Sequence, residues 1–242
     1  MQYLALCQRT KRETGRSGSA ISSVGTAAGE DLDICRWVAD AWRAIQQMPY
    51  NWRWMRQSMT PGLLAVGTCV QPPGTVGATA FDRWAPETDD YRPSYFESST
   101  PGAEVPLVWL PYERFRGAFL VGTPTSGAPQ YWSEAPSGNL LIGPPPDLAT
   151  YKFRGDYFSL PTELSGDEDE PAMPEQFHML VVWEAVKIAA GFDAAPDVWQ
   201  RANDQAQRLL DTLIDRQGEK ITITGRPLGL GRPAASSGFA FP

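Results

Sequence analysis

The single histidine, His178, is the first residue of this chain that could do chemistry. An imidazole can serve as general base beside a serine or cysteine nucleophile, so His178 raises the alternative of a hydrolase. A lone histidine on an amphipathic helix is nevertheless more often structural. The sequence also contains no H-E-x-x-H, C-x-x-C, G-x-x-x-x-G-K-[ST] or G-x-S-x-G pattern. We therefore predict a protein without enzymatic activity, catalytic residues or cofactors.

An acidic run and the tryptophans could each bind a ligand. Asp167–Glu170 offers carboxylate oxygens of the kind that hold a divalent cation, but such a run is more typical of a solvated loop, and we predict no metal site. Nine tryptophans could include a platform for sugar rings. Trp84 and Trp132 fit this best because they fall outside the predicted helices. A glycan-binding module is thus a second alternative, and it requires Trp84 or Trp132 to be exposed.

Composition and charge exclude several classes of protein. The 242 residues carry 21 basic and 28 acidic side chains, a net charge of −7, whereas a protein that grips DNA phosphates needs a basic excess. The sequence contains no stretch of 18 consecutive apolar residues, so it predicts no membrane span. The N-terminal residues do not have the order of a secretory signal. Cys7, Cys35 and Cys69 are therefore predicted to be reduced, buried thiols.

Helical periodicity is confined to the two ends of the chain. We predict helices over residues 2–14, 30–48, 174–191 and 196–217, with Pro174 at the first helical position of the third. In the second and fourth helices the apolar residues recur at steps of three or four, which places them on one face. The residues that define the faces are Ile34, Val38, Ala41, Trp42, Ile45 and Met48, and then Trp199, Ala202, Ala206, Leu209, Leu210 and Leu213.

The middle of the chain is rich in proline, glycine and aromatic residues and predicts strands. Residues 130–143 read as a hairpin with Gly138 in the left-handed bulge position. Residues 150–158 read as one strand with Tyr151, Phe153 and Tyr157 on its buried side. Residues 105–110 predict another strand, residues 111–119 a short helix or turn, and residues 160–173 an acidic linker.

The last residues cannot form a core of their own. A short strand-like run, Ile221–Thr224, precedes a tract of glycine, proline, alanine and serine. Ile221 and Ile223 could add a strand to the sheet edge of a partner, and Phe239 and Phe241 could fill pockets. With Arg226, these four residues form the predicted partner-binding set.

The order of these features resembles the head-to-tail adaptor proteins of tailed phages. The opening LCQRTKRETGRSG, followed by GEDLDICRWVADAWRAIQQMPYNWRWMR, is similar to the first two helices of that family. VWLPYERFRGAFL and GNLLIGPPPDLATYKFRGDYFSLPTEL are similar to its strand-to-turn element and hairpin. The stretch that begins DEDEPAMPEQFHML is similar to its C-terminal helical pair. These stretches cover most of residues 3–215, and residues 60–104 and those after Gly218 match least.

The resemblance implies a structural protein of the virion neck or tail, made in the host cytoplasm. Such adaptors form a ring, typically of twelve copies, between the portal protein and the tail nozzle or hub. They extend the channel through which DNA passes without specific binding, and no membrane is involved. Other neck roles, tail terminator or head completion, remain open alternatives.

We therefore expect an α+β fold. A helical bundle combines residues 1–52 with residues 174–217, a β-rich domain over residues 53–173 is inserted between them, and residues 218–242 form an extended tail.

Overall fold

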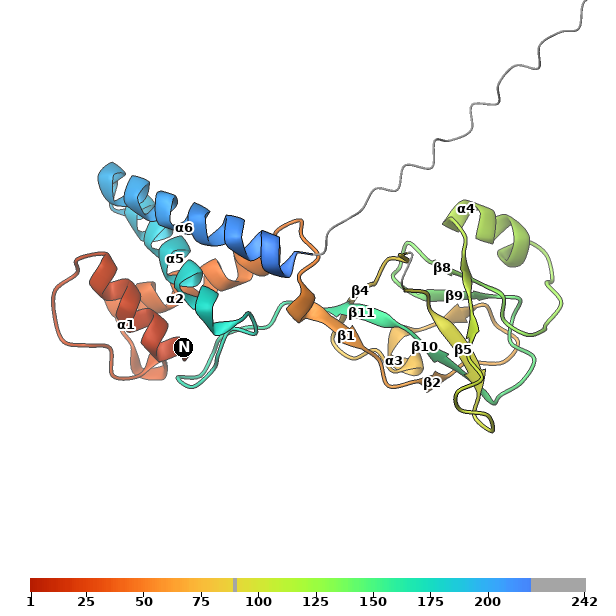
Figure 1. Ribbon diagram of the computed structural model, residues 1–242. Coiled ribbons are helices and arrows are strands. Elements are labelled where there is room, and N and C mark those ends of the chain that lie inside the picture. The colour runs from red at the N-terminus through yellow and green to blue at the C-terminus, as the bar shows by residue number, and fades with distance from the viewer. Residues whose placement is uncertain (89–90, 219–242) are drawn as a thin grey trace, which may run out of the picture.

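The computed structural model describes residues 1–88 and 91–218. Helices from both ends of the chain lie together at one side of the molecule, and the strands lie at the other (Figure 1). The predicted mixture of helix and strand, with helices at both ends, is confirmed. We refer to these two sides as the helical part and the β part.

The helical segments differ in length. The α-helices are α1 (Tyr3–Glu13), α2 (Glu30–Gln46), α3 (Pro73–Val76), α4 (Tyr112–Phe115), α5 (His178–Phe192) and α6 (Pro196–Gln217). Short 3-10 segments are η1 (Val24–Thr26), η2 (Arg53–Met55) and η4 (Glu175–Phe177), and η3 (Arg116–Leu120) is a π-helical turn.

The strands form three sheets, with orders β1-β11-β4, β2-β10-β5-β6 and β3-β9-β8-β7. All pairs are antiparallel except β7 with β8. The strands are β1 (Arg56–Ser58), β2 (Gly62–Leu63), β3 (Val70–Gln71), β4 (Phe81–Trp84), β5 (Ser94–Glu97), β6 (Val105–Pro106), β7 (Val108–Trp109), β8 (Tyr131–Glu134), β9 (Leu140–Gly143), β10 (Tyr151–Arg154) and β11 (Asp156–Ser159).

One apolar cluster joins the four long helices. Ile34 and Trp42 of α2 are fully buried in it beside Phe177 of η4, and Leu209 of α6 packs against it. Helix α5 contacts α1, α2 and α6, so it lies at the centre of the group. Its apolar residues occur all round the helix, as expected for a helix covered on most sides. The apolar faces predicted for α2 and α6 pack here, except that Trp199 of α6, predicted on that face, is 41% exposed and lies outside the cluster.

The linker before α5 caps the first helix. Helix α1 has no capping side chain, so its first N–H groups need other acceptors. The amides of Tyr3 and Leu4 donate to the carbonyls of Asp169 and Asp167, at 2.7 and 3.2 Å. The Oδ1 of Asp167 also accepts from the amide of Val24, at 2.6 Å. The acidic linker therefore ties the start of the chain to its C-terminal half.

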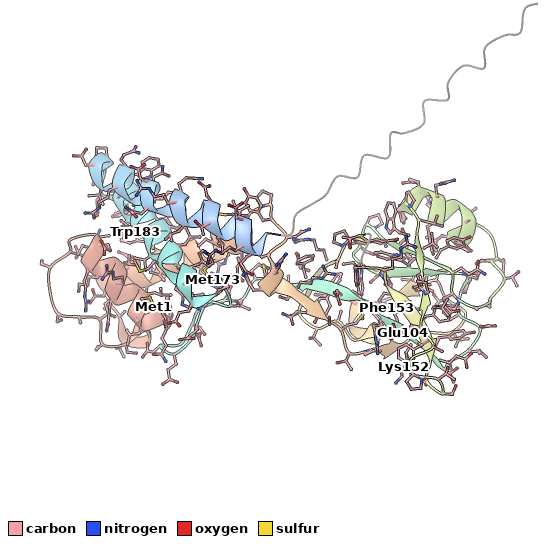
Figure 2. The ribbon with its side chains drawn as sticks, in the orientation of Figure 1. Met1, Glu104, Lys152, Phe153, Met173 and Trp183 are labelled. Carbon is pink, nitrogen blue, oxygen red and sulfur yellow. The ribbon has the colours of Figure 1, made fainter. Side chains whose placement is uncertain are left out.

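The three sheets enclose a second apolar cluster. It includes Trp84 from β4, Tyr95 from β5, Trp132 from β8 and Phe153 from β10. Phe153 has no exposed surface and lies inside the β part in Figure 2. A smaller cluster of Cys69, Phe115 and Leu141 lies under α4. The cysteine prediction is confirmed, because Cys7, Cys35 and Cys69 are all buried free thiols.

Strand β11 belongs to both large clusters. Tyr157 packs into the β part, whereas Phe158, the next residue, packs into the helical part. Its neighbour β4 behaves in the same way, since Trp84 faces the β cluster and Ala85, directly after the strand, faces the helices. Consecutive residues of a strand point to opposite faces. The three-stranded sheet is therefore a shared wall between the two parts (Figure 1).

The sequence-based predictions for several elements need correction. Residues 150–158 are two strands in different sheets, because the chain passes from one sheet to the other at Gly155; Tyr151, Phe153 and Tyr157 are buried as predicted. Residues 105–110 also split into β6 and β7, in different sheets, around the buried Leu107. Pro174 is extended, with ψ 137°, so α5 begins later, at His178, after a 3-10 turn.

The other local predictions hold. The hairpin of β8 and β9 forms with Gly138 at φ 80°, and a short helix follows β7. Helices α1, α2 and α6 lie where periodicity places them, although α2 ends at Gln46.

Gly77 allows a test of the packing in the β part. It ends α3 at φ +100°, and a Cβ atom there would lie 2.1 Å from the carbonyl oxygen of Thr60. We expect Gly77→Ala to lower the free energy of unfolding by more than about 2 kcal/mol, because backbone atoms must move. The measurement is urea denaturation followed by tryptophan fluorescence.

Gly74→Ala is the matched control, since no atom lies within 4 Å of its Cβ position. We expect that change to shift stability by less than about 1 kcal/mol. Equal denaturation midpoints for the two variants would contradict the described approach of α3 to Thr60.

Candidate interaction surfaces

The predicted partner-binding residues lie beyond the described part of the chain. Ile221, Ile223, Arg226, Phe239 and Phe241 all follow Gly218, the last described residue. The residues of the other hypotheses, and the surfaces of the two parts, are described.

Both tryptophans of the glycan-binding alternative are buried. Trp84 is 5% exposed and Trp132 is 3% exposed, so neither face can stack on a sugar. The Nε1 of Trp84 donates to the carbonyl of Gly138 at 3.0 Å, and its ring meets Phe153 edge-on at 5.9 Å. The exposure that the glycan alternative requires is therefore not found, because both tryptophans pack in the core between the sheets.

His178 is held by the chain itself. Its ring is buried, with Nδ1 near the terminal amino group of Met1 and Nε2 at 2.9 Å from the carbonyl of Met173. Met1 and Met173 both lie in the helical part in Figure 2. A carbonyl can only accept, so Nε2 carries the proton and Nδ1 faces the ammonium as an acceptor. Both nitrogens are occupied, and the hydrolase alternative finds no free base at this residue.

The acidic run makes structural hydrogen bonds. Asp169 accepts from the amides of Gly166 and Ser165, both at 2.7 Å, and from the Ser165 hydroxyl at 3.1 Å. The bonds from Gly166 and Ser165 lower the pKa of Asp169, because they favour its charged form. Within residues 1–88 and 91–218, no group of three or more histidine, cysteine or acidic side chains is arranged to hold a metal ion.

The first exposed apolar surface lies on the edge strands of the β part. Val105 of β6 is 44% exposed, and Val108 and Trp109 of β7 are 50% and 47% exposed. Strands β6 and β7 each end their sheet, so one side of each has no paired strand among the described residues. Exposed apolar side chains on a sheet edge are typical of a contact site, because unprotected edges tend to pair with other chains. We call Val105, Val108 and Trp109 the β-edge surface.

The second surface lies at the turn between α5 and α6. Phe192 is 75% exposed, Trp199 41% and Ile188 38%. Phe192 contacts Trp37 of α2 with ring centroids 5.8 Å apart, and the Arg16 guanidinium lies 5.0 Å from the Trp37 ring. The turn also contains a shallow hollow of about 400 Å³. We call Ile188, Phe192 and Trp199 the helix-turn surface.

The two surfaces belong to opposite parts of the molecule. The turn between α5 and α6 lies at the end of the helical part that is far from the strands, whereas α4, which follows β7, lies in the β part (Figure 1).

The chain matches a known protein family over most of its length. Residues 1–230 match the SU10 adaptor protein family, a span that includes both parts of the structure. The chain belongs to this family. The resemblance to phage head-to-tail adaptors is thereby confirmed, and the adaptor is a structural protein of the phage neck. No curated protein matches it. Among the described residues of the adaptor, no helix is long and apolar enough to cross a membrane.

Sequence reasoning did not identify either surface. Phe192 follows the predicted end of its helix, and a lone phenylalanine there carries no sign of its exposure. Val108 and Trp109 sit in a strand so short that no alternation of buried and exposed residues can develop. Exposure at both places depends on neighbours that only the fold supplies.

Replacing tryptophans of the adaptor one at a time should distinguish buried from exposed tryptophans by the loss of stability. We expect Trp84→Ala to lower the free energy of unfolding by about 3–5 kcal/mol, because it leaves a cavity and an unpaired Gly138 carbonyl. Trp109→Ala removes a half-exposed ring and should cost less than about 1 kcal/mol. Chemical denaturation measures both changes, and the reverse ranking would show that the β core is wrongly described.

Proposed function

We propose that the adaptor forms a twelvefold ring between the portal and the tail nozzle or hub, and that the ring extends the DNA channel. The observation that carries this proposal is the family match over residues 1–230. The two apolar surfaces support it, because an adaptor must bind one partner at each end. In this proposal the helix-turn surface serves one partner and the β-edge surface the other.

The proposed division of the chain follows from the same argument. Residues 1–52 and 174–217 form a helical bundle that carries one contact surface. Residues 53–173 form a β-rich domain that carries the other, and residues 218–242 form a tail. Ile221, Ile223, Arg226, Phe239 and Phe241 of this tail are proposed to bind a neighbouring subunit or the portal. The shared wall of β1, β11 and β4 would keep the two surfaces at a fixed separation.

The charge of the adaptor suits a channel wall. With a net charge of −7, it repels the DNA phosphates on average. A wall of this kind lets DNA pass without specific binding, which the proposed position in the neck requires.

Binding to purified portal rings and purified tails tests the proposal. We expect the adaptor to co-sediment with portal rings and to form rings of twelve copies in electron micrographs. The double substitution Val108→Ser and Trp109→Ser should weaken binding to one partner at least tenfold. Phe192→Ser with Trp199→Ser should weaken binding to the other by as much, because each removes one apolar surface.

Val66→Ser with Leu148→Ser is the matched control, since both residues are similarly exposed, at 49% and 43%, outside the two surfaces. It should leave both affinities unchanged. An adaptor that binds neither partner, or double variants that both weaken the same partner only, would overturn the proposal.

A further inference from the structure

The hollow at the helix turn is a shallow, open depression lined mainly by apolar residues. It lies where α5 ends and α6 begins, and its volume is about 400 Å³. Most of its lining side chains are small, and a proline, a tryptophan and a glutamine also line it. The lining residues are Ala190, Gly191, Ala194, Ala195, Pro196 and Trp199. Aromatic rings and prolines dock well on such surfaces, because both bury flat apolar area at little cost in conformational entropy.

The hollow continues into the helix-turn surface. Phe192 and Ile188 lie one helical turn apart on α5, so both point to the same side of that helix. Phe192 is 75% exposed, the highest value for a large apolar residue in the described part of the chain. Leaving this much apolar surface in water is unfavourable, so a chain that has not yet met its partner gains by covering it.

The chain itself has a segment of suitable chemistry. Residues 219–242 end in Gly-Phe-Ala-Phe-Pro, which places Phe239, Phe241 and Pro242 within four residues of one another. The segment also carries Lys220, Arg226 and Arg232 against a single acid, Glu219, so it is basic while the remainder of the chain is acidic.

Acidic side chains flank the hollow. Asp193 and Asp197 stand at either end of the turn that forms its floor. Asp193 pairs with Arg16 at 2.7 Å, yet its side chain remains 42% exposed. The Asp193 carboxylate is shared with Arg16, so any attraction of a basic segment here is modest and is weakened further by salt.

Residues 219–242 are long enough to reach the hollow from the end of α6. Helix α6 has 22 residues, so the hollow beside Pro196 lies about 33 Å from the end of the helix at Gln217. The residues from Gly218 to Ala240 could span about 70 Å when extended, twice that distance. Docking within one chain also has a high effective concentration, which favours it over docking between two chains.

We propose that, before assembly, residues 219–242 fold back along α6 and place Phe239 and Phe241 in the hollow of the same chain. The segment covers the helix-turn surface and keeps its own aromatic residues from other proteins. A partner that binds this surface displaces the segment and releases it in the same event. This inference concerns the isolated chain and stands or falls separately from the proposed ring.

Cysteine cross-linking in the isolated full chain tests the proposal. Ala240→Cys places a thiol between the two phenylalanines, and Ala195→Cys places a second thiol in the hollow. The three natural cysteines are buried and should react slowly with a short bismaleimide. A comparison chain carries Ala240→Cys with Gln207→Cys, an exposed site on α6 that is closer to Gly218. An undocked segment reaches position 207 more often than position 195, because shorter loops close more readily.

We expect the Ala195→Cys chain to cross-link within itself at least threefold faster than the Gln207→Cys chain. Adding Phe239→Ser and Phe241→Ser should abolish this preference, whereas Ile221→Ser with Ile223→Ser should retain it. Gln200→Cys replaces Ala195→Cys if the latter variant does not fold, since Gln200 also lines the hollow. Equal or slower reaction at the hollow would overturn the inference. So would cross-links formed mainly between chains, seen as dimers on a denaturing gel.

Discussion

The apolar cluster shared by α1, α2, α5 and α6 is the constraint on which the rest of the structure depends. None of these helices can bury its apolar face alone, so the two ends of the chain must meet. The contacts that close the group join residues far apart in sequence. Arg16 pairs with Asp193 across 177 positions, and the N–H groups at the start of α1 find their acceptors in the linker before α5. The intervening chain leaves this cluster to form the β part, and Met55, Ala85 and Phe158 from it still pack against the helices.

Trp52 lies where the chain leaves the helical part and enters the β part. It is fully buried, its Nε1 donates to the carbonyl of Ile45 at 2.9 Å, and its ring stacks on Trp54 at 4.6 Å. Its backbone also forms an isolated bridge with Gly218, at the end of α6. One residue thus joins the end of α2, the start of the strands and the end of the last helix. The chain therefore enters the β part from a residue that is fixed by contacts with α2, with Trp54 and with Gly218.

The shared wall of β1, β11 and β4 connects the two parts, because its residues enter both large clusters. Alternate residues of β11 enter the two large clusters, so a rotation of one part against the other would disrupt both. His178, considered as a base, and Asp169, from the acidic run considered for a cation, both bond to the backbone, at the Met173 carbonyl and the Gly166 amide.

The sequence by itself determined the helices, because their apolar residues recur at steps of three or four, which places them on one face of a helix. It also determined the hairpin turn at Gly138 and the mixed α and β class, and its ordered stretches indicated the adaptor family. Only the tertiary structure decided where strands end. Residues 150–158 alternate as one strand would, yet the chain changes sheets at Gly155, because the register depends on partners such as β5 and β4 that lie far away in sequence. The exposure of side chains was decided in the same way. Trp84 and Trp132 are covered by other elements, whereas Trp109 and Phe192 are not, and no local sequence pattern specifies which elements will lie over them.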